Sequence, residues 1–238
     1  MAPATDVDVR SASERTFATP ELMEHILSFL IDKLHQIRYG EDPRSVKTYK
    51  NADWLLHLLH CSEVNRTWNH GIRGSKVLQR ALFLEPDQRQ GRNWDVNLPK
   101  SSVIGPHLQA PVLNPIIQTI FKAYHFRYWH LSLEASNNKY TAYLIITRRD
   151  LPDLGALAKT GQGRTISRML LSQPPCTALD SVVWGDRDET RDYVGRTTTL
   201  RDSRIYCEDG LTLEIVHDRV AEMFEEHPDV VAIKLVTM

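Results

Sequence analysis

The sequence predicts a mixed fold, in which a small N-terminal unit of three helices is followed by a small α+β domain. Two changes of pattern lead to this prediction. Apolar residues recur at every third or fourth position up to about residue 86, which is the period of an amphipathic helix. From about residue 129, apolar and polar residues alternate, which is the period of a strand. The chain has 238 residues, of which 42% are hydrophobic and 25% charged, so it can bury a core.

The first predicted helix begins near Thr19 and is followed by a polar loop insertion at about 32–52. Residues 1–17 are polar and aperiodic, so we expect a disordered tail before it. Thr19 is a good N-cap, and Pro20 suits the first helical position. The apolar side chains then recur at helical spacing: Leu22, Met23, Ile26, Leu27, Phe29 and Leu30.

Two further helices complete the helical unit, which we place at residues 18–86. The second runs over about 53–69, and its stripe contains Trp54, Leu55, Leu58, Leu59, Cys61, Val64 and Trp68. The third is capped by Ser75, runs to about residue 82 and stops before Pro86. Three short helices cannot hide this much apolar surface from one another. Since burying one Leu or Ile is worth about 1.5–3 kcal/mol, a partner or the second domain must cover the remainder.

The α+β domain is predicted at 111–238, after a Pro- and Gly-containing linker or extended connection at 87–110. We expect a short helix at 115–123, a hairpin at 129–146 and another short helix at 165–172. Candidate strands follow at 179–184 and 203–207. A long helix over 211–226 shows one apolar face, with Leu213, Val216, Val220, Met223 and Phe224. The closing strand at 230–236 is apolar on both faces, so we expect it at the centre of its sheet.

Charge and hydropathy exclude several classes of function. Lys and Arg number 29 against 30 Asp and Glu, for a net charge of −1, so we expect neither nucleic acid nor a membrane as a partner. No apolar run approaches the roughly 18 residues that span a bilayer. The first twenty residues have no apolar centre, so we expect no signal peptide and a cytoplasmic or nuclear location, or both.

No pattern predicts a metal, a cofactor or a catalytic centre. Cys61, Cys176 and Cys207 are far apart and form no CxxC pair, so we expect free thiols. His57 and Cys61 have the spacing of two ligands on one helix, but no companion cluster exists elsewhere. No GxSxG is present, and nothing marks a cysteine nucleophile. We therefore expect no enzyme.

A glycine-containing segment at 160–165, TGQGRT, precedes a predicted helix and is faintly similar to a phosphate-binding loop. It lacks the Lys-Ser/Thr pair of a P-loop and the third Gly of a dinucleotide-binding fingerprint. We interpret it as a flexible turn that ends in a helix cap, with a small nucleotide-binding protein as the remote alternative.

Three segments of the helical unit together resemble the F-box motif of filamentous-fungal proteins. That family typically shows a Leu-Pro-x-Glu-Leu-type start, an Ile-Leu pair, a Val-x-Arg-x-Trp stretch and a Ser-x-x-Leu-Gln-Arg-Ala-Leu-Phe ending. The corresponding residues here are Glu21-Leu22, Ile26-Leu27, Val64-x-Arg66-x-Trp68 and Ser75-x-x-Leu78-Gln79-Arg80-Ala81-Leu82-Phe83. The later segment RMLLSQPP, at 168–175, also looks like a stretch that recurs in these fungal proteins.

The resemblance implies a non-catalytic adaptor of an SCF-type cullin–RING ubiquitin ligase. Such an adaptor docks on the Skp-type linker subunit, reaches the cullin indirectly and holds a protein substrate on its C-terminal domain. An amphipathic helix laid in an apolar groove is a recurring mode of recognition, and the first helix suits it. The residues expected at the linker subunit are Thr19, Pro20, Leu22, Met23, Ile26, Leu27, Leu30, Leu55, Leu59, Val64 and Trp68.

Two departures from the family pattern keep a second interpretation open. The proline of the Leu-Pro pair is displaced to Pro20, and about twenty residues are inserted between the first two helices. An F-box-like interaction protein that does not assemble into a ligase also fits these features. The substrate and the oligomeric state have no signature in the sequence.

Overall fold

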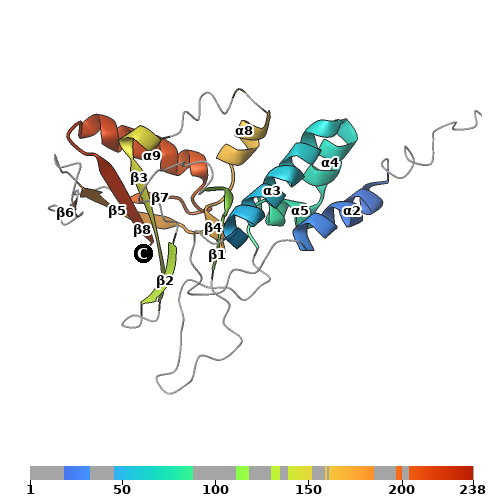
Figure 1. The fold of residues 1–238 in the computed structure, drawn as a ribbon, viewed down its shortest axis with the longest axis horizontal. Coiled ribbons are helices and arrows are strands. Elements are labelled where there is room, and N and C mark those ends of the chain that lie inside the picture. The colour runs from blue at the N-terminus through green and yellow to red at the C-terminus, as the bar shows by residue number, and fades with distance from the viewer. Residues whose placement is uncertain are drawn as a thin grey trace, which may run out of the picture.

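Helices gather at one end of the molecule and a sheet at the other in the computed structural model (Figure 1). The structure describes residues 19–32, 46–87, 111–117, 130–134, 139–151, 159, 161–184, 197–199 and 204–237. The mixed fold, with helices in the N-terminal half and a C-terminal helix and strand, is confirmed. The predicted tail at 1–17 and nearly all of the linker at 87–110 lie outside the described residues.

Within residues 19–32 and 46–87, which the structure describes, the helical end contains four helices rather than three: α2 (Pro20–Asp32), α3 (Val46–Val64), α4 (Arg66–Gly74) and α5 (Lys76–Ala81). The predicted insertion at 32–52 was wrong at its C-terminal end, because α3 begins at Val46. Asn51 and Ala52 are buried, so packing extends the helix beyond the apolar stripe that is visible in the sequence.

The helix predicted at 53–69 is broken at Asn65, which the periodicity did not show. Asn65 has an extended backbone, and its side-chain oxygen accepts a hydrogen bond of 3.0 Å from the backbone N–H of Trp68. This is an N-cap, so the chain ends α3 and starts α4 without a loop. Ser75 makes the next break: its N–H donates to the carbonyl of Gly71, and its Oγ accepts from Leu78 N–H.

The sheet contains β2 (His130–Glu134), β3 (Lys139–Thr147), β5 (Ala178–Trp184), β6 (Thr197–Thr199), β7 (Ile205–Tyr206) and β8 (Ala232–Thr237). The strand order is β2-β3-β8-β5-β6, β7 also pairs with β5, and every pairing is antiparallel. The hairpin of β2 and β3 is confirmed. The last strand of the chain lies between β3 and β5, so its predicted central position is confirmed as well.

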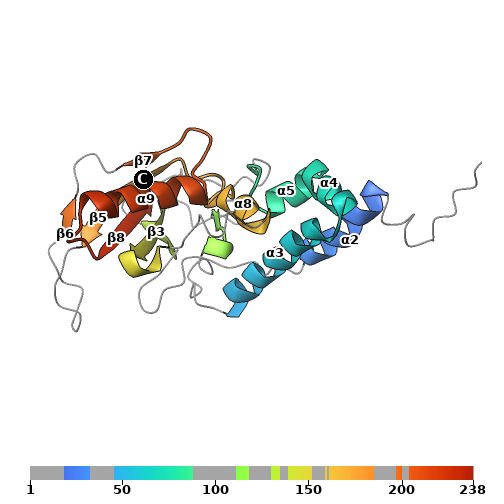
Figure 2. The same ribbon diagram turned by 90° about the horizontal axis from the view of Figure 1, so that it is seen from above.

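Helix α9 (Leu213–Glu226) covers one face of this sheet (Figure 2). Its five predicted core residues are all buried, and Ile233 and Leu235 of β8 are buried with them. Its C-terminal end is held by Arg148, in the 3-10 helix η1 (Arg148–Asp150). The Arg148 guanidinium donates to the carbonyls of Phe224 at 2.6 Å and His227 at 2.8 Å. A cation at a helix C-terminus is also attracted to the negative end of the helix dipole, which stabilises this arrangement.

A second, two-stranded sheet lies between the helices and the main sheet. It pairs β1 (Val112–Leu113) with β4 (Ser172–Gln173). The helix predicted at 165–172 was wrong at both ends, because α8 spans Gly161–Ser167 and Ser172 already belongs to β4. Of the helix predicted at 115–123, Ile116 and Ile117 are helical and 118–123 lie outside the described residues.

The segment 168–175 joins the two ends of the molecule. Leu170 N–H donates to the carbonyl of Phe83 at 2.7 Å, just after α5. The Gln173 amide donates to the carbonyls of Arg80 at 2.5 Å and Glu85 at 3.2 Å. One continuous hydrophobic core therefore runs from α2 to β8, and α8 packs against α3 at the helical end.

Buried Asn114 fixes the same junction from the other side. Its amide donates to the carbonyl of Leu170, and its side-chain oxygen accepts from Ile116 N–H, both at 3.0 Å. Both polar ends of this side chain are satisfied, as a position with 1% exposure requires.

Candidate functional site

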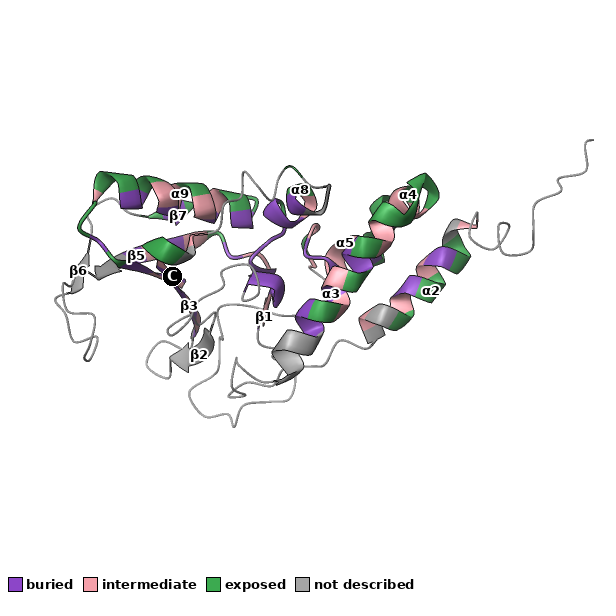
Figure 3. Cartoon of the chain, turned by 45° about the horizontal axis from the view of Figure 1, so that its top comes forward, coloured by how far each residue is buried: buried purple, intermediate pink, exposed green. Residues whose placement is uncertain are grey.

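Helix α2 has one buried and one exposed apolar face. Met23 and Leu27 are buried in the core together with residues of the other helices. Figure 3 shows buried and exposed bands along α2. Three further apolar side chains are exposed instead: Leu22 at 45%, Ile26 at 39% and Phe29 at 56%. They lie at positions i, i+4 and i+7, so they share one side of the helix. We call Leu22, Ile26 and Phe29 the exposed α2 stripe.

The other residues predicted at the linker-subunit interface are divided between core and surface. Leu55 and Leu59 are buried in the core, Trp68 is half-buried, and Val64 is 63% exposed at the end of α3. Thr19 precedes α2, and its carbonyl accepts from Met23 N–H at 3.1 Å. Pro20 and Leu30 are in α2, but their side chains lie outside the described part.

Phe29 is the exposed stripe residue that the predicted interface omits, and Val77 of α5 is a second apolar side chain on the surface, at 46% exposure. The helical spacing places Phe29 on the apolar side of α2, but spacing alone does not divide a broad stripe into covered and uncovered parts. That division depends on where α3, α4 and α5 pack, and the local sequence does not record it.

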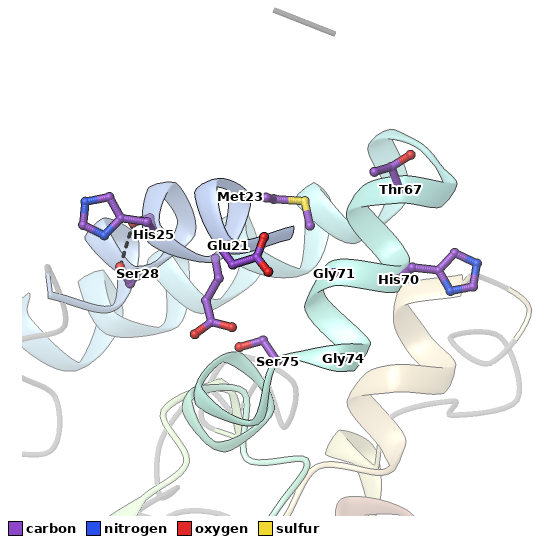
Figure 4. A pocket seen from close by; sticks show the side chains of 10 residues that line it. Glu21, Met23, His25, Ser28, Thr67, His70, Gly71, Gly74 and Ser75 are labelled. Carbon is purple, nitrogen blue, oxygen red and sulfur yellow. Dashed lines mark hydrogen bonds between the residues drawn. The ribbon is translucent and has the colours of Figure 1, made fainter. Parts of the chain in front are cut away.

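A pocket of about 710 Å³ lies beside α2, on the side that faces α4 and α5 (Figure 4). Its lining combines the polar side of α2 with the backbone of α4, and contains Glu21, Glu24, His25, Ser28, Thr67, His70, Gly71, Gly74 and Ser75 together with Met23. Gly71 allows this close approach, because a Cβ there would overlap the methyl group of Met23. The exposed α2 stripe borders this polar pocket, because the ring of His25 in the pocket lining lies 5.2 Å from the ring of Phe29.

Two other sites were considered from the sequence, a metal site at His57 and Cys61 and a phosphate-binding loop at 160–165. No group of three His, Cys, Asp or Glu side chains in the described ranges could hold a metal ion. The ring of His60, which lies between these two residues in α3, shares a 2.8 Å hydrogen bond with the carbonyl of Leu56. Gly161 and Gly163 lie inside α8 rather than in a turn before it, so the interpretation as a flexible turn was wrong. No helix among the described residues is long and apolar enough to cross a membrane.

The Cys176 thiol is buried, and burial raises its pKa from 9.0 to about 12. A cysteine with that pKa is almost entirely protonated at pH 8, and only the thiolate reacts with disulfide reagents. We expect Cys176 to be unreactive toward Ellman's reagent in the native protein and to react fully in urea. Fast native labelling at Cys176 would contradict the buried position.

The same shift predicts how stability depends on pH. Since the folded-state pKa lies above the unfolded-state value, the contribution of the protonated thiol is present below about pH 9 and is lost as the pH rises toward 12. A Cys176→Ala variant should show a smaller loss of stability over that range, measured by urea unfolding at several pH values.

No family model, curated protein or solved structure matches this chain.

Proposed function

We propose that this protein is a substrate adaptor of an SCF-type ubiquitin ligase, and that the exposed α2 stripe docks on the Skp-type linker subunit. The single observation that carries the proposal is the stripe itself: three large apolar side chains, 39–56% exposed, on a helix that Met23 and Leu27 anchor in the core. Exposed residues of this kind, gathered on one helix, are typical of a helix-in-groove interface.

The sequence motif and the capped helices support the same function. Asn65 caps α4 and Ser75 caps α5, and both helices pack against α2, so the surface that they share is formed before any partner binds. A surface that is formed in advance loses little conformational entropy on binding, which favours affinity. Val64 and Val77 add apolar area at the ends of α3 and α5.

In this proposal the protein acts by position and makes no covalent bond. The helical end binds the linker subunit, the sheet end binds the substrate, and the ligase brings substrate lysines close to a charged ubiquitin-conjugating enzyme. Holding both partners raises their effective concentration, which speeds a transfer that is otherwise bimolecular. The shared core and the hydrogen bonds of segment 168–175 support this role, because they hold the two ends together.

The test is co-purification with a fungal Skp-type linker subunit, with Leu22→Asp/Ile26→Asp as the disrupting variant. Both side chains are exposed, so the variant should fold like the wild type while placing two charges in the proposed interface. Desolvating a charge without a partner costs several kcal/mol, so we expect at least a hundredfold loss of affinity, which is about 2.7 kcal/mol.

Val231→Asp is the matched control, because Val231 is equally exposed, at 52%, but belongs to the sheet end. It should bind the linker subunit like the wild type. If the wild type does not bind under conditions where a known F-box protein does, the adaptor function is wrong. Equal loss in the control and the disrupting variant would also contradict it.

A further inference from the structure

The face of the main sheet opposite α9 is covered at Ala232 and Ile145, which are buried, and half-open at Tyr143, Lys234 and Val236. Along β8, Ile233, Leu235 and Thr237 are buried on the α9 side, whereas Lys234 and Val236 between them are half-buried. Successive side chains of a strand point to opposite faces, so Lys234 and Val236 belong to the other face. Helix α9 lies on the first face alone (Figure 2).

The strand register identifies which side chains share this second face. Val236 of β8 is opposite Tyr143 of β3 on one side and Asp180 of β5 on the other. Tyr206 of β7 is opposite Ala178, two residues before Asp180, and is 64% exposed. We call Tyr143, Asp180, Arg204, Tyr206, Lys234 and Val236 the open sheet face.

The charges on this face are not balanced. Asp180 pairs with Arg204 at 3.2 Å, and both side chains are about half exposed. Lys234 Nζ lies 4.8 Å from the centre of the Tyr143 ring, and no carboxylate pairs with Lys234 among the described residues. Among the described side chains of the open sheet face there is therefore one cation in excess, next to an aromatic ring and the aliphatic Val236.

The α9 side of the same domain carries mainly negative charge. Helix α9 presents Glu214, Asp218, Glu222, Glu225 and Glu226 to solvent, against one half-buried Arg219. An acidic partner is repelled by α9 and attracted to the open sheet face, so the field orients its approach.

We infer that the open sheet face binds an extended acidic peptide segment of the protein substrate, in which a carboxylate pairs with Lys234 and a neighbouring apolar or aromatic side chain packs on Tyr143 and Val236. This inference rests on the proposed adaptor function for its biological meaning, while the binding itself does not depend on it.

A peptide fits this face better than a nucleic acid does. Nucleic-acid binding needs several cations along a phosphate backbone, and each neutralised phosphate makes the affinity more dependent on salt. Here Asp180 lies in the middle of the row and neutralises Arg204. One cation beside an aromatic ring matches one carboxylate with an apolar neighbour.

The experiment measures fluorescence anisotropy of the full chain with a labelled peptide of about eight alternating Glu and Tyr residues, which is long enough to cross the face. The same peptide with Lys in place of Glu and a single-stranded oligothymidine are the comparison probes. We expect the acidic peptide to bind, and Lys234→Glu to weaken it about tenfold or more through loss of the ion pair.

Three variants make the result specific. Lys234→Arg should retain binding, Tyr143→Ala should weaken it, and Lys76→Glu, the same charge change on the exposed side of α5, should leave it within about twofold. Circular dichroism checks that each variant folds, and Lys234→Gln replaces Lys234→Glu if the latter does not. Equal binding of the acidic and basic peptides, equal loss in Lys76→Glu, or tighter binding of oligothymidine would overturn the inference.

The peptide test and the linker-subunit test fail independently. Leu22→Asp/Ile26→Asp should leave peptide binding unchanged, because α2 lies at the other end of the molecule (Figure 1). Peptide binding without linker-subunit binding would reject only the adaptor function. Linker-subunit binding without binding of the acidic peptide would reject only the open sheet face.

Discussion

Replacing Gly210 with Ala should destabilise the protein by about 3 kcal/mol and lower its Tm by roughly 6–12 °C. Gly210 has φ +105°, a conformation that side chains with a Cβ rarely adopt. A Cβ at this position would lie 2.6 Å from Cβ of Pro175 and 3.0 Å from Cδ2 of Leu170. Both neighbours belong to the segment that joins the helices to the sheet, so they have little freedom to move.

Gly74→Ala is the matched control for this prediction. Gly74 is the last residue of α4, and a Cβ there would meet nothing within 4 Å. Because Ala loses less backbone entropy than Gly in a helix, we expect this variant to be unchanged or more stable, by up to about 1 kcal/mol. Urea unfolding of both variants measures the difference. A Gly210→Ala variant as stable as Gly74→Ala would contradict the close packing at Pro175.

Replacing Asn114 with Leu should cost about 2–4 kcal/mol, although the two side chains have nearly the same shape. The change removes both hydrogen bonds of the Asn114 amide and leaves the carbonyl of Leu170 and the N–H of Ile116 without these partners. Both bonds are buried, so water cannot replace them without opening the junction.

Asn69→Leu provides the comparison, because Asn69 is half-buried and its amide makes one 3.1 Å bond, to the carbonyl of Ser62. We expect it to cost about 1 kcal/mol. Thermal unfolding followed by circular dichroism ranks the two variants. Equal costs would mean that Asn114 is more accessible to water than its 1% exposure indicates.

The apolar periodicity within single helices and strands made most of the fold predictable from the sequence. The hairpin of β2 and β3, the buried face of α9 and the central position of β8 follow from patterns several residues long, which tertiary packing did not override. The errors lie where one side chain or a distant contact decides the structure. The Asn65 cap divides a continuous apolar stripe, and β1 and β4 depend on a pairing between residues about sixty positions apart.

The candidate interface was predictable as a helix but not as a surface. Leu22 and Leu27 have the same chemistry and are five positions apart, yet the first is exposed and the second is buried. The two side chains lie on different sides of α2, and α2 packs on α4 by the side of Met23 and Leu27, where Gly71 lets Met23 approach. Local sequence carries no signal for which part of a broad apolar stripe its neighbours will cover.

The junction at segment 168–175 also limits how this protein can be recombined. Its helical end cannot simply be exchanged for that of another protein. The carbonyls of Phe83, Arg80 and Glu85 accept hydrogen bonds from residues about ninety positions later in the chain. A chimaera cut between α5 and β1 would leave those carbonyls and the core side chains beside them without their native neighbours. Substitutions that shift the helices therefore require compensating substitutions in segment 168–175, so the two ends are expected to evolve together.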